Sequence, residues 1–354
     1  MVSELECRRL PKVVRIFIAK KMLECLHQCT MYTMLGAPRT FEWQHVAKDD
    51  REVVCEADVK LVGFEPAEEA TPTATAIKHA GSLTTSREAV KTATIDVVRE
   101  FAEDGVVYLE LRSTPRATSE MTKRAYIEAL IDGKGIDEGS REHGLVTRLL
   151  LSIDRRQSVE EAEHTVDMAA AEPSGLIVGI ELSGNPSIDG RKFLPVLQRA
   201  RKLGLKVSVH LAEVADQLDE VEEFLLFRPD RIGHGTYLHT QDRYIDVMLQ
   251  NRIPLEICLS SNVMSMTTTT ISDSHLRFWR EKSIPFCICT DDKGLMDCDL
   301  SGEYYKASKA FDLTLNDLWD ISKDALEMSF LDENSDDYKR LAALFAQRKL
   351  IDCN

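Results

Sequence analysis

The chain has 354 residues, 44% of them hydrophobic, which is long enough to bury a large core in one α/β barrel domain. Asp and Glu (59) outnumber Lys and Arg (44), and the net charge of −15 argues against a broad nucleic-acid surface or an anionic membrane as partner. The nine cysteines form no C-x-x-C pair, and we find neither an apolar leader nor a run of membrane-spanning length. We therefore expect a reduced, cytoplasmic, monomeric protein with a small-molecule partner.

Residues 1–82 are predicted to form a divergent N-terminal segment, ahead of a barrel domain over residues 83–354. An apolar, β-branched run near Val14 to Ala19 suits a first barrel strand. The rest of the segment has no convincing helix or strand pattern. Cys25 and Cys29 flank His27 with a spacing that could hold a metal, although irregular cysteines in such a segment are more often plain thiols.

From Leu83 onward, strand and helix patterns alternate. Predicted strands cover 106–111, 146–153, 176–182, a stretch from 206, 231–234, 253–259 and 285–290. The first predicted helix begins at a capping box, Thr85-x-x-Glu88, and ends at Asp104-Gly105. Further helices are predicted over 120–131, 159–171, 191–202, 218–227, 300–311, 315–328 and 337–347. With one strand near the N-terminus, the count is eight. Eight mostly apolar strands separated by helices predict a TIM (β/α)8 barrel of parallel strands with extra C-terminal helices.

Polar residues follow the predicted strands. In a (β/α)8 barrel the active site lies at the carboxyl ends of the strands. Those ends carry Arg112 to Arg116, Asp154 to Arg156, Ser183 to Pro186, His210 with Glu213, Gly233 to Gly235, Ser260 to Asn262, and Thr290 to Lys293. Any one of them could be a solvated loop, which is the commoner fate of polar residues. Seven polar strand ends together predict a functional pocket.

His210, Glu213, His234 and Asp291 have side chains that suit a zinc-dependent hydrolase. Zinc binds imidazole and carboxylate groups, and it lowers the pKa of a bound water to about 7. Glu213 could then protonate a ring nitrogen of a substrate, while His234 orients the water. This chemistry suits the loss of an amine from an electron-poor ring. A structural histidine in a turn is an equally good interpretation of His234 alone, and Asp291 could belong to an exposed acidic turn.

The end of the strand at 106–111 is typical of an anion-binding cluster. Thr114 and Arg116 offer a hydroxyl and a guanidinium, and Arg binds phosphate with bidentate geometry. Together with Arg155 they favour a nucleoside monophosphate over a nucleoside. The alternative is that Arg112, Arg116 and Arg155 form ion pairs at the rim of the barrel, which are frequent and weak.

The order of these motifs resembles the adenosine deaminase superfamily. The resemblance rests on His210-Leu-Ala-Glu213, Arg231-Ile-Gly-His234-Gly235, Leu259-Ser-Ser-Asn262-Val263 and Thr290-Asp291-Asp292-Lys293-Gly294. Leu111-Arg-Ser-Thr-Pro-Arg116, Ile153-Asp-Arg-Arg156 and Leu182-Ser-Gly-Asn-Pro186 are similar to its adenosine deaminase-like branch, the N6-methyl-AMP deaminases. Over residues 83–330, the resemblance implies a zinc-containing barrel that hydrolyses N6-methyl-AMP, or a related 6-substituted purine nucleotide, to IMP and an amine.

The resemblance also implies a role for each matching residue. His210 and Asp291 would be zinc ligands, Glu213 the proton donor, and His234 the histidine beside the metal-bound water. Asp292 and Gly184 would contact the purine ring, and the sugar and phosphate would be bound by Ser113, Thr114, Pro115, Arg116 and Asp154. The implied partner is a purine nucleoside monophosphate, as expected for an enzyme of purine salvage.

The first strand departs from the family pattern. After Leu10-Pro-Lys-Val13 the family presents a His-x-His pair to the metal, whereas this chain has Ile16 and Ile18 at those positions. Isoleucine cannot ligate zinc, so His210 and Asp291 fall short of the three protein ligands usual for catalytic zinc. Three hypotheses stay open: an active aminohydrolase with other ligands, a metal-deficient nucleotide-binding homologue, and an interaction protein on an inherited barrel.

Overall fold

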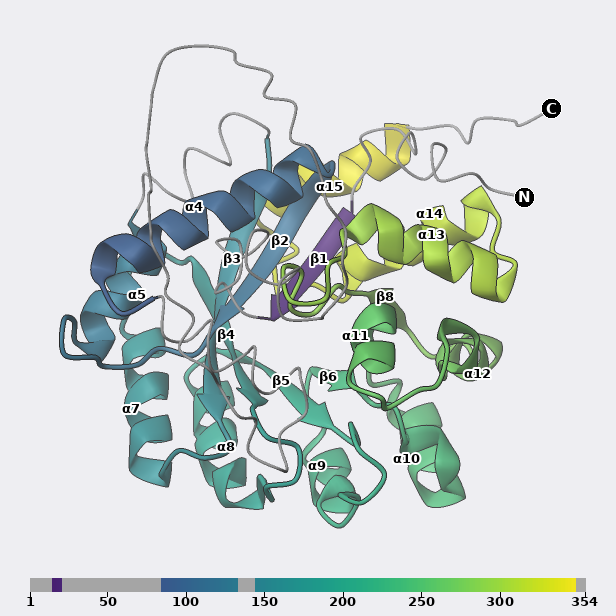
Figure 1. Ribbon diagram of the computed structural model, residues 1–354, viewed down its shortest axis with the longest axis horizontal. Coiled ribbons are helices and arrows are strands. Elements are labelled where there is room, and N and C mark those ends of the chain that lie inside the picture. Colours follow the sequence, from purple (N-terminus) through teal and green to yellow (C-terminus); the bar gives the residue numbers. More distant parts are fainter. Residues whose placement is uncertain (1–14, 21–83, 133–143, 348–354) are drawn as a thin grey trace, which may run out of the picture.

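The computed structural model describes residues 15–20, 84–132 and 144–347 (Figure 1). Within them, eight strands form one sheet in the order β1 to β8, and each neighbouring pair is parallel. β8 also contacts β1. The fold is the predicted (β/α)8 barrel. The strands are β1 (Arg15–Lys20), β2 (Val106–Ser113), β3 (Val146–Asp154), β4 (Ile177–Ser183), β5 (Lys206–Leu211), β6 (Arg231–His234), β7 (Leu255–Ile257) and β8 (Phe286–Ile288).

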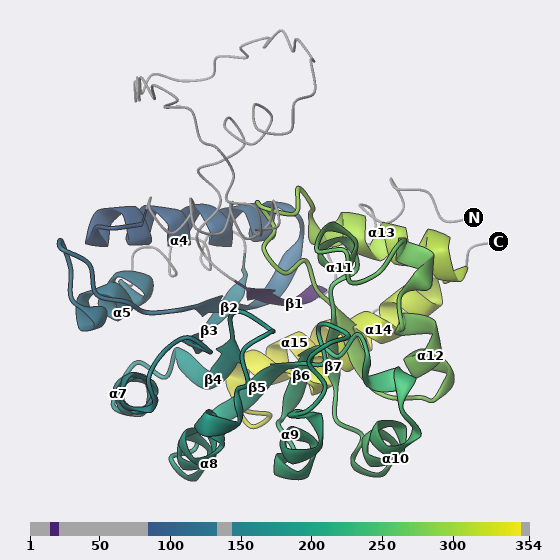
Figure 2. The same ribbon diagram turned by 60° about the horizontal axis from the view of Figure 1, so that its bottom comes forward.

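Helices lie around the outside of the sheet in both ribbon views (Figures 1 and 2). They are α4 (Arg87–Glu103), α5 (Lys123–Ile131), α7 (Val159–Ala170), α8 (Leu194–Lys202), α9 (Val221–Phe227), α10 (Asp242–Asn251), α11 (Leu259–Met264), α12 (Leu276–Glu281), α13 (Leu300–Phe311), α14 (Leu315–Glu327) and α15 (Asp336–Gln347). Helices α14 and α15 extend the alternating pattern, as the C-terminal periodicity predicted.

Most predicted elements lie within a few residues of the observed ones, and two boundaries were wrong. Leu259 opens α11 and does not end a strand, because β7 stops at Ile257. The N-cap of α4 is Ser86, whose hydroxyl accepts a hydrogen bond from the Ala89 amide at 3.2 Å. Thr85 was predicted to cap this helix, but the extended backbone needed at an N-cap falls one residue later.

Strand β1 occupies the run predicted as the first strand and pairs with β2 from Arg15 opposite Val106 to Lys20 opposite Arg112. The hypothesis of a metal site at Cys25, His27 and Cys29 lies outside the described residues. The division of the chain at residue 83 stays a prediction.

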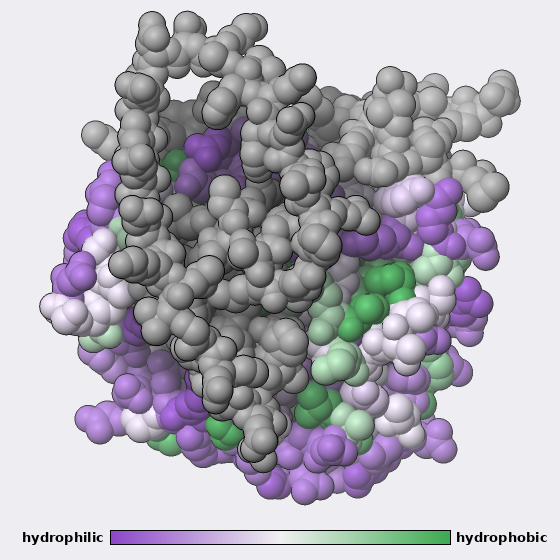
Figure 3. Space-filling model, viewed as in Figure 1, coloured by the Kyte–Doolittle hydropathy of each residue, from purple (hydrophilic) through white to green (hydrophobic). Residues whose placement is uncertain are grey.

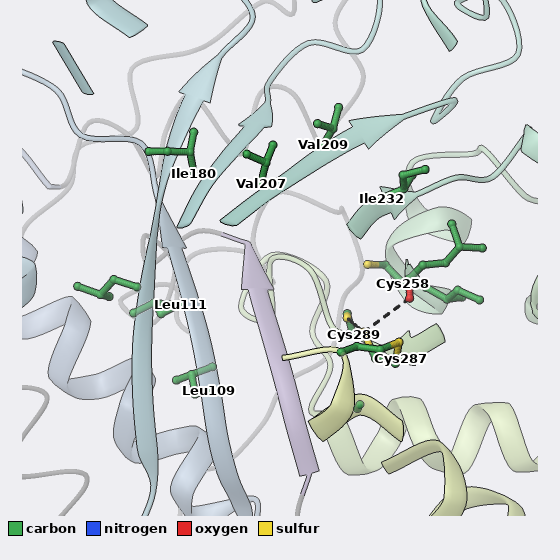
Figure 4. Packing of buried hydrophobic residues seen from close by; sticks show 14 of the residues in the cluster. Leu109, Leu111, Ile180, Val207, Val209, Ile232, Cys258, Cys287 and Cys289 are labelled. Carbon is green, nitrogen blue, oxygen red and sulfur yellow. Dashed lines mark hydrogen bonds between the residues drawn. The ribbon is translucent and has the colours of Figure 1, made fainter. Parts of the chain in front are cut away.

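Alternation along each strand separates an apolar side from a polar side. Leu109 and Leu111 of β2, and Val207 and Val209 of β5, are buried in the hydrophobic core (Figure 4). Burying one such side chain contributes about 1.5–3 kcal/mol. The residues between them, Glu110 in β2 and Ser208 in β5, point to the opposite face. The barrel interior therefore receives polar side chains from the same strands.

The outer surface is mainly polar in the view of Figure 3. Exposed large hydrophobic side chains on described residues come from separate helices and loops, among them Leu203, Leu226 and Met266. None of the helices in the described ranges is both long and apolar enough to cross a membrane.

Candidate active site

Three strands bring together the two predicted ligands, His210 and Asp291, and the predicted catalytic residue His234. His210 lies in β5, His234 ends β6, and Asp291 follows β8. One ligand atom from each of these three residues lies within 4.8 Å of the others, and all three side chains are buried. The two imidazole rings are 5.0 Å apart between centroids. We call His210, His234 and Asp291 the mouth cluster, because it lies at the carboxyl ends of the strands.

The backbone around the mouth cluster adopts left-handed conformations. Ala212, His234 and Asp291 have φ angles of 50°, 58° and 60°. Such conformations cost non-glycine residues about 1–3 kcal/mol each and persist where the surrounding structure imposes them. Alternation from Arg231 and Gly233 would turn His234 toward the helices. The left-handed residue instead lets its ring reach the other two members of the cluster.

The His210 ring is held from two sides. Its Nδ1 lies 2.9 Å from Oε1 of Glu181, which is fully buried in β4. On the other side, a Cβ at Gly233 would approach the ring to 2.9 Å, so only glycine leaves room for it. A carboxylate at this distance favours the tautomer with the proton on Nδ1. Nε2 is therefore the nitrogen that carries the lone pair of a metal ligand.

His234 is oriented by two neighbours. Its Nδ1 donates to Oδ1 of Asn262 at 2.9 Å, and Nε2 of His275 donates to its backbone carbonyl at 2.9 Å. Burial, together with His239 and His234, lowers the pKa of His275 to about 3, so His275 is a neutral donor. In the neutral ring, a proton on Nδ1 leaves the lone pair of His234 on Nε2.

Two carboxylates face this lone pair. Nε2 of His234 lies 3.5 Å from Oδ2 of Asp291 and 3.6 Å from Oε1 of Glu213. It is buried and forms no hydrogen bond within the described part of the chain. Ser261 donates to Oδ2 of Asp291 at 2.7 Å. A nitrogen lone pair between carboxylate oxygens is favourable only with a cation or proton among them, so the donor set fits a divalent metal ion.

The residues flanking the cluster differ in exposure. Asp292 is buried, whereas the side chain of Glu213 is 15% exposed. Gly184 has a φ of 107°, and a Cβ there would lie 2.8 Å from Oδ1 of Asp154. A side chain at position 184 would therefore displace that carboxylate.

The residues predicted to bind the sugar and phosphate are held by neighbouring groups. The Ser113 hydroxyl lies 2.8 Å from that of Tyr126 in α5, so it faces the helix layer. Arg116 donates to the Thr84 hydroxyl at 2.6 Å, and Asp154 accepts from Arg156 at 2.6 and 2.8 Å. Next to Ser113 in the chain, Thr114 is half-buried and Pro115 is buried. The assignment of these five residues to the sugar and phosphate stays a prediction.

Arg112 and Arg155 correct the interpretation of the basic residues. Arg155 is 2% exposed; it pairs with both carboxylate oxygens of Glu220 and donates to the His210 carbonyl at 2.8 Å. Arg112 pairs with Glu181 and Glu256 inside the barrel. These pairs use the guanidinium groups and bury them, so Arg155 does not serve the anion site proposed for it. Both residues form ion pairs, as the alternative interpretation predicted, but these pairs lie inside the protein and not at the rim of the barrel.

The sequence did not single out Glu181 and gave Asn262 and Ser261 no roles. Glu181 lies in the apolar strand Ile177–Ser183, and only its charge within that strand could have marked it. Asn262 and Ser261 belong to a recognised motif, but their contacts with His234 and Asp291 join segments that are distant in sequence.

A comparison with protein-family models matches residues 61–343 to the family described as Adenosine deaminase. The chain belongs to this family. The match begins before Leu83 and continues past Phe330, so it includes the motifs recognised in the sequence and extends beyond them. Membership places the chain among hydrolytic purine deaminases.

Several relatives share the adenosine deaminase-like branch that the motifs predicted. The chain is 45% identical over 249 residues to the adenosine deaminase-like protein of Caenorhabditis elegans, covering 69% of this chain and 63% of that protein. It is 40% identical over 264 residues to the N6-methyl-AMP deaminase of Homo sapiens, covering 72% of this chain and 74% of the human protein. The chain thus spans less than two thirds of the C. elegans protein.

Solved structures extend the comparison. The apo N6-methyl-AMP deaminase from Arabidopsis thaliana matches with a TM-score of 0.71 and 33% identity, over 77% of this chain and 82% of that one. The arabidopsis ADAL complexed with IMP gives a TM-score of 0.70 and 33% identity, over 77% and 81% of the two chains. An amidohydrolase from Burkhoderia ambifaria with bound Zn shares the fold, with a TM-score of 0.75 at 17% identity over 98% of this chain and 96% of that one.

Proposed function

We propose that the chain hydrolyses N6-methyl-AMP, or a related 6-substituted purine nucleotide, to IMP and the corresponding amine. The meeting of His210, His234 and Asp291 at one point, with Glu213 beside them, is the observation that carries the proposal. Relatives named N6-methyl-AMP deaminases and a similar structure complexed with IMP support the substrate class. The proposal includes a cytoplasmic monomer, which size-exclusion chromatography and cell fractionation test.

We assign the cation to the mouth cluster. Aliphatic Ile16 and Ile18 provide no ligand atoms, and catalytic zinc commonly uses three protein ligands. The sequence placed His234 beside a metal-bound water, but the lone pair on its Nε2 suits it as the third ligand after His210 and Asp291. Zinc bound there would lower the pKa of a water molecule to about 7 and so provide a nucleophile at neutral pH.

Glu213 is proposed to move the protons. Its partly exposed carboxyl group lies 3.6 Å from Nε2 of His234, so it borders the cluster and still has contact with solvent. It would donate a proton to a purine ring nitrogen as water adds to the adjacent carbon, and a proton would then pass to the departing amine. One water is consumed, the carbon–oxygen bond forms and the carbon–nitrogen bond breaks.

The remaining predicted residues are proposed to bind the nucleotide. Asp292 and Gly184 would contact the purine, and Ser113, Thr114, Pro115, Arg116 and Asp154 would face the sugar and phosphate. Among these, Thr114 and Arg116 fit the anion best, because the Ser113 hydroxyl faces Tyr126 and Asp154 already binds Arg156.

A metal-deficient nucleotide-binding homologue is the second candidate, and the presence of Ile16 and Ile18 favours it. One experiment separates the two candidates. We expect the purified full chain to release methylamine and IMP from N6-methyl-AMP, and Glu213→Gln to lower kcat by about 10³-fold with little change in nucleotide binding. Binding of IMP without turnover or bound zinc in the wild-type chain would favour the homologue instead.

A further inference from the structure

Five charged side chains fill the barrel interior beneath the mouth cluster. Glu110 and Arg112 come from β2, Glu181 from β4, Arg231 from β6 and Glu256 from β7, and each is at most 3% exposed. We call these five residues the barrel column. Each of its carboxylates pairs with at least one of its guanidinium groups.

The barrel column is one connected series of contacts. Arg112 donates to Oε1 of Glu181 at 2.8 Å and pairs through its other terminal nitrogen with Glu256. Arg231 donates to the same Glu256 oxygen at 2.8 Å and pairs with Glu110. The order is therefore Glu181, Arg112, Glu256, Arg231 and Glu110.

The two ends of the column meet different parts of the fold. At one end, Glu181 Oε1 lies 2.9 Å from Nδ1 of His210 in the mouth cluster. At the other end, Glu110 accepts a hydrogen bond from the Phe330 amide at 2.6 Å, and Arg231 donates to the Met328 carbonyl at 2.7 Å. The column thus connects His210 with the segment that follows α14.

Glu181 is fixed at both of its carboxylate oxygens. Oε1 accepts from Arg112, and Oε2 accepts from the Ser152 hydroxyl. The same Oε1 faces His210, whose ring lies so near Gly233 that a Cβ at that position would approach it to 2.9 Å. The position of the imidazole therefore depends on Glu181, and the position of Glu181 depends on Arg112.

The chemistry of Arg112 suits this task better than that of a lysine. Its planar guanidinium reaches Glu181 with Nη1, and Glu256 and the Ser208 hydroxyl with Nη2. A lysine would keep the charge but could not hold the two carboxylates with a rigid fork. Burial by itself would lower the pKa of Arg112. The carboxylates of Glu256 and Glu181 raise that pKa by more than burial lowers it, so the guanidinium is always charged.

We propose that Arg112 is a positioning residue for the metal centre: it holds Glu181 so that His210 presents Nε2 to the cation. The proposal rests on the assignment of the mouth cluster as a zinc site. Arg231 provides a matched comparison, because it is equally buried and has carboxylate partners, and its ion pairs are with Glu110 and Glu256.

The test uses the full chain labelled with ¹⁵N-histidine, in the wild type and in Arg112→Lys, Arg231→Lys and Ser152→Ala. The imidazole nitrogen shifts of metal-free protein report which ring nitrogen of His210 carries the proton, and competition with a chromophoric chelator reports the affinity for Zn²⁺. The His210 signals are identified by their loss in His210→Gln. Ser152→Ala removes one hydrogen bond to the Glu181 carboxylate and no charged side chain, so it gives an answer even if an arginine variant fails to fold.

We expect Arg112→Lys to lose the uniform Nδ1–H tautomer of His210 and to weaken Zn²⁺ binding by about 10-fold or more. Ser152→Ala should have the same effects to a smaller degree, and Arg231→Lys should leave the tautomer intact and the affinity within about threefold. The proposal is overturned if Arg112→Lys and Ser152→Ala keep the wild-type tautomer, or if Arg231→Lys disturbs it equally. A wild-type chain that binds no Zn²⁺ would contradict the proposed function, while the tautomer comparison would still decide the role of Arg112.

Discussion

The barrel column and the mouth cluster are neighbouring sets of buried polar side chains, and their charges are neutralised in different ways. In the column, Glu181 and Glu256 are bridged by Arg112, and Glu256 and Glu110 are bridged by Arg231. At the mouth cluster, the carboxylates of Asp291 and of the neighbouring Glu213 lie against Nε2 of His234. The first arrangement neutralises most of its charge internally, and the second becomes favourable when a cation binds.

The comparison shows how the same residue types give stability in one place and chemistry in another. Buried ion pairs add little net stability over apolar packing, but removing one partner of a pair costs about 3–5 kcal/mol. We infer that the column fixes the strand ends, and that the mouth cluster uses this rigidity to hold three ligands in left-handed or crowded positions.

Breaking the column should have the largest effect on stability. Arg231→Met leaves Glu110 and Glu256 without one guanidinium, so we expect the free energy of unfolding to fall by about 4 kcal/mol. Urea unfolding followed by tryptophan fluorescence measures the change. Arg148→Met is the control, because Arg148 pairs with Asp337 near the surface and its loss should cost less than about 1 kcal/mol. Equal losses would remove the distinction between internal and surface pairs.

The pH dependence of stability tests the pairing of Glu256 within the barrel column. Burial raises the pKa of Glu256, but Arg112 and Arg231 outweigh it and lower that pKa from 4.5 to about 2. The pairing therefore stabilises the fold fully above pH 4.5, by about 3 kcal/mol, and the contribution is lost as pH falls toward 2.

A comparison with Glu256→Gln isolates this contribution. The difference in unfolding free energy between wild type and variant should shrink by about 1 kcal/mol between pH 7 and pH 3.5. A difference that stays constant over this range would mean that Glu256 has an ordinary pKa in the folded chain.

The smallest expected effect tests the fit around His210. In Gly233→Ala, the new Cβ would lie 2.9 Å from the ring, so the imidazole must leave the position that it holds beside Glu181. We expect zinc affinity to fall by about 10-fold, measured by chelator competition. Gly179→Ala is the matched control in β4, because its Cβ would meet the Lys206 carbonyl at 2.7 Å and not His210. Unchanged affinity in Gly233→Ala would show that the ring tolerates displacement.

Local sequence patterns predicted the barrel because strand and helix periodicity is encoded within each element. They also predicted that His210 and Asp291 would lie at strand ends on the same face, since parallel strands share one carboxyl edge. The partner of His210 could not be found in this way. Glu181 is the one charged residue of an apolar strand. Its contact with His210 depends on how β4 pairs with β5, which no local sequence pattern shows.

The direction of the arginine side chains was equally hidden. Arg112 and Arg155 stand at strand ends, where a guanidinium can face a ligand or turn into the protein. Arg155 turns inward because Glu220 and the His210 carbonyl come from a loop and a strand more than fifty residues away. The direction of each arginine side chain follows from long-range contacts. The sequence therefore left open whether these arginines bind a ligand or form ion pairs within the protein.

The zinc content of the full chain and of its His234→Gln variant tests the central claim most directly. We expect one tightly bound zinc per wild-type chain, measured by elemental mass spectrometry after dialysis. His234→Gln should retain less than about a tenth of it while staying folded by circular dichroism. Zinc that is absent from the wild type, or bound equally well by the variant, would contradict a three-ligand site at His210, His234 and Asp291.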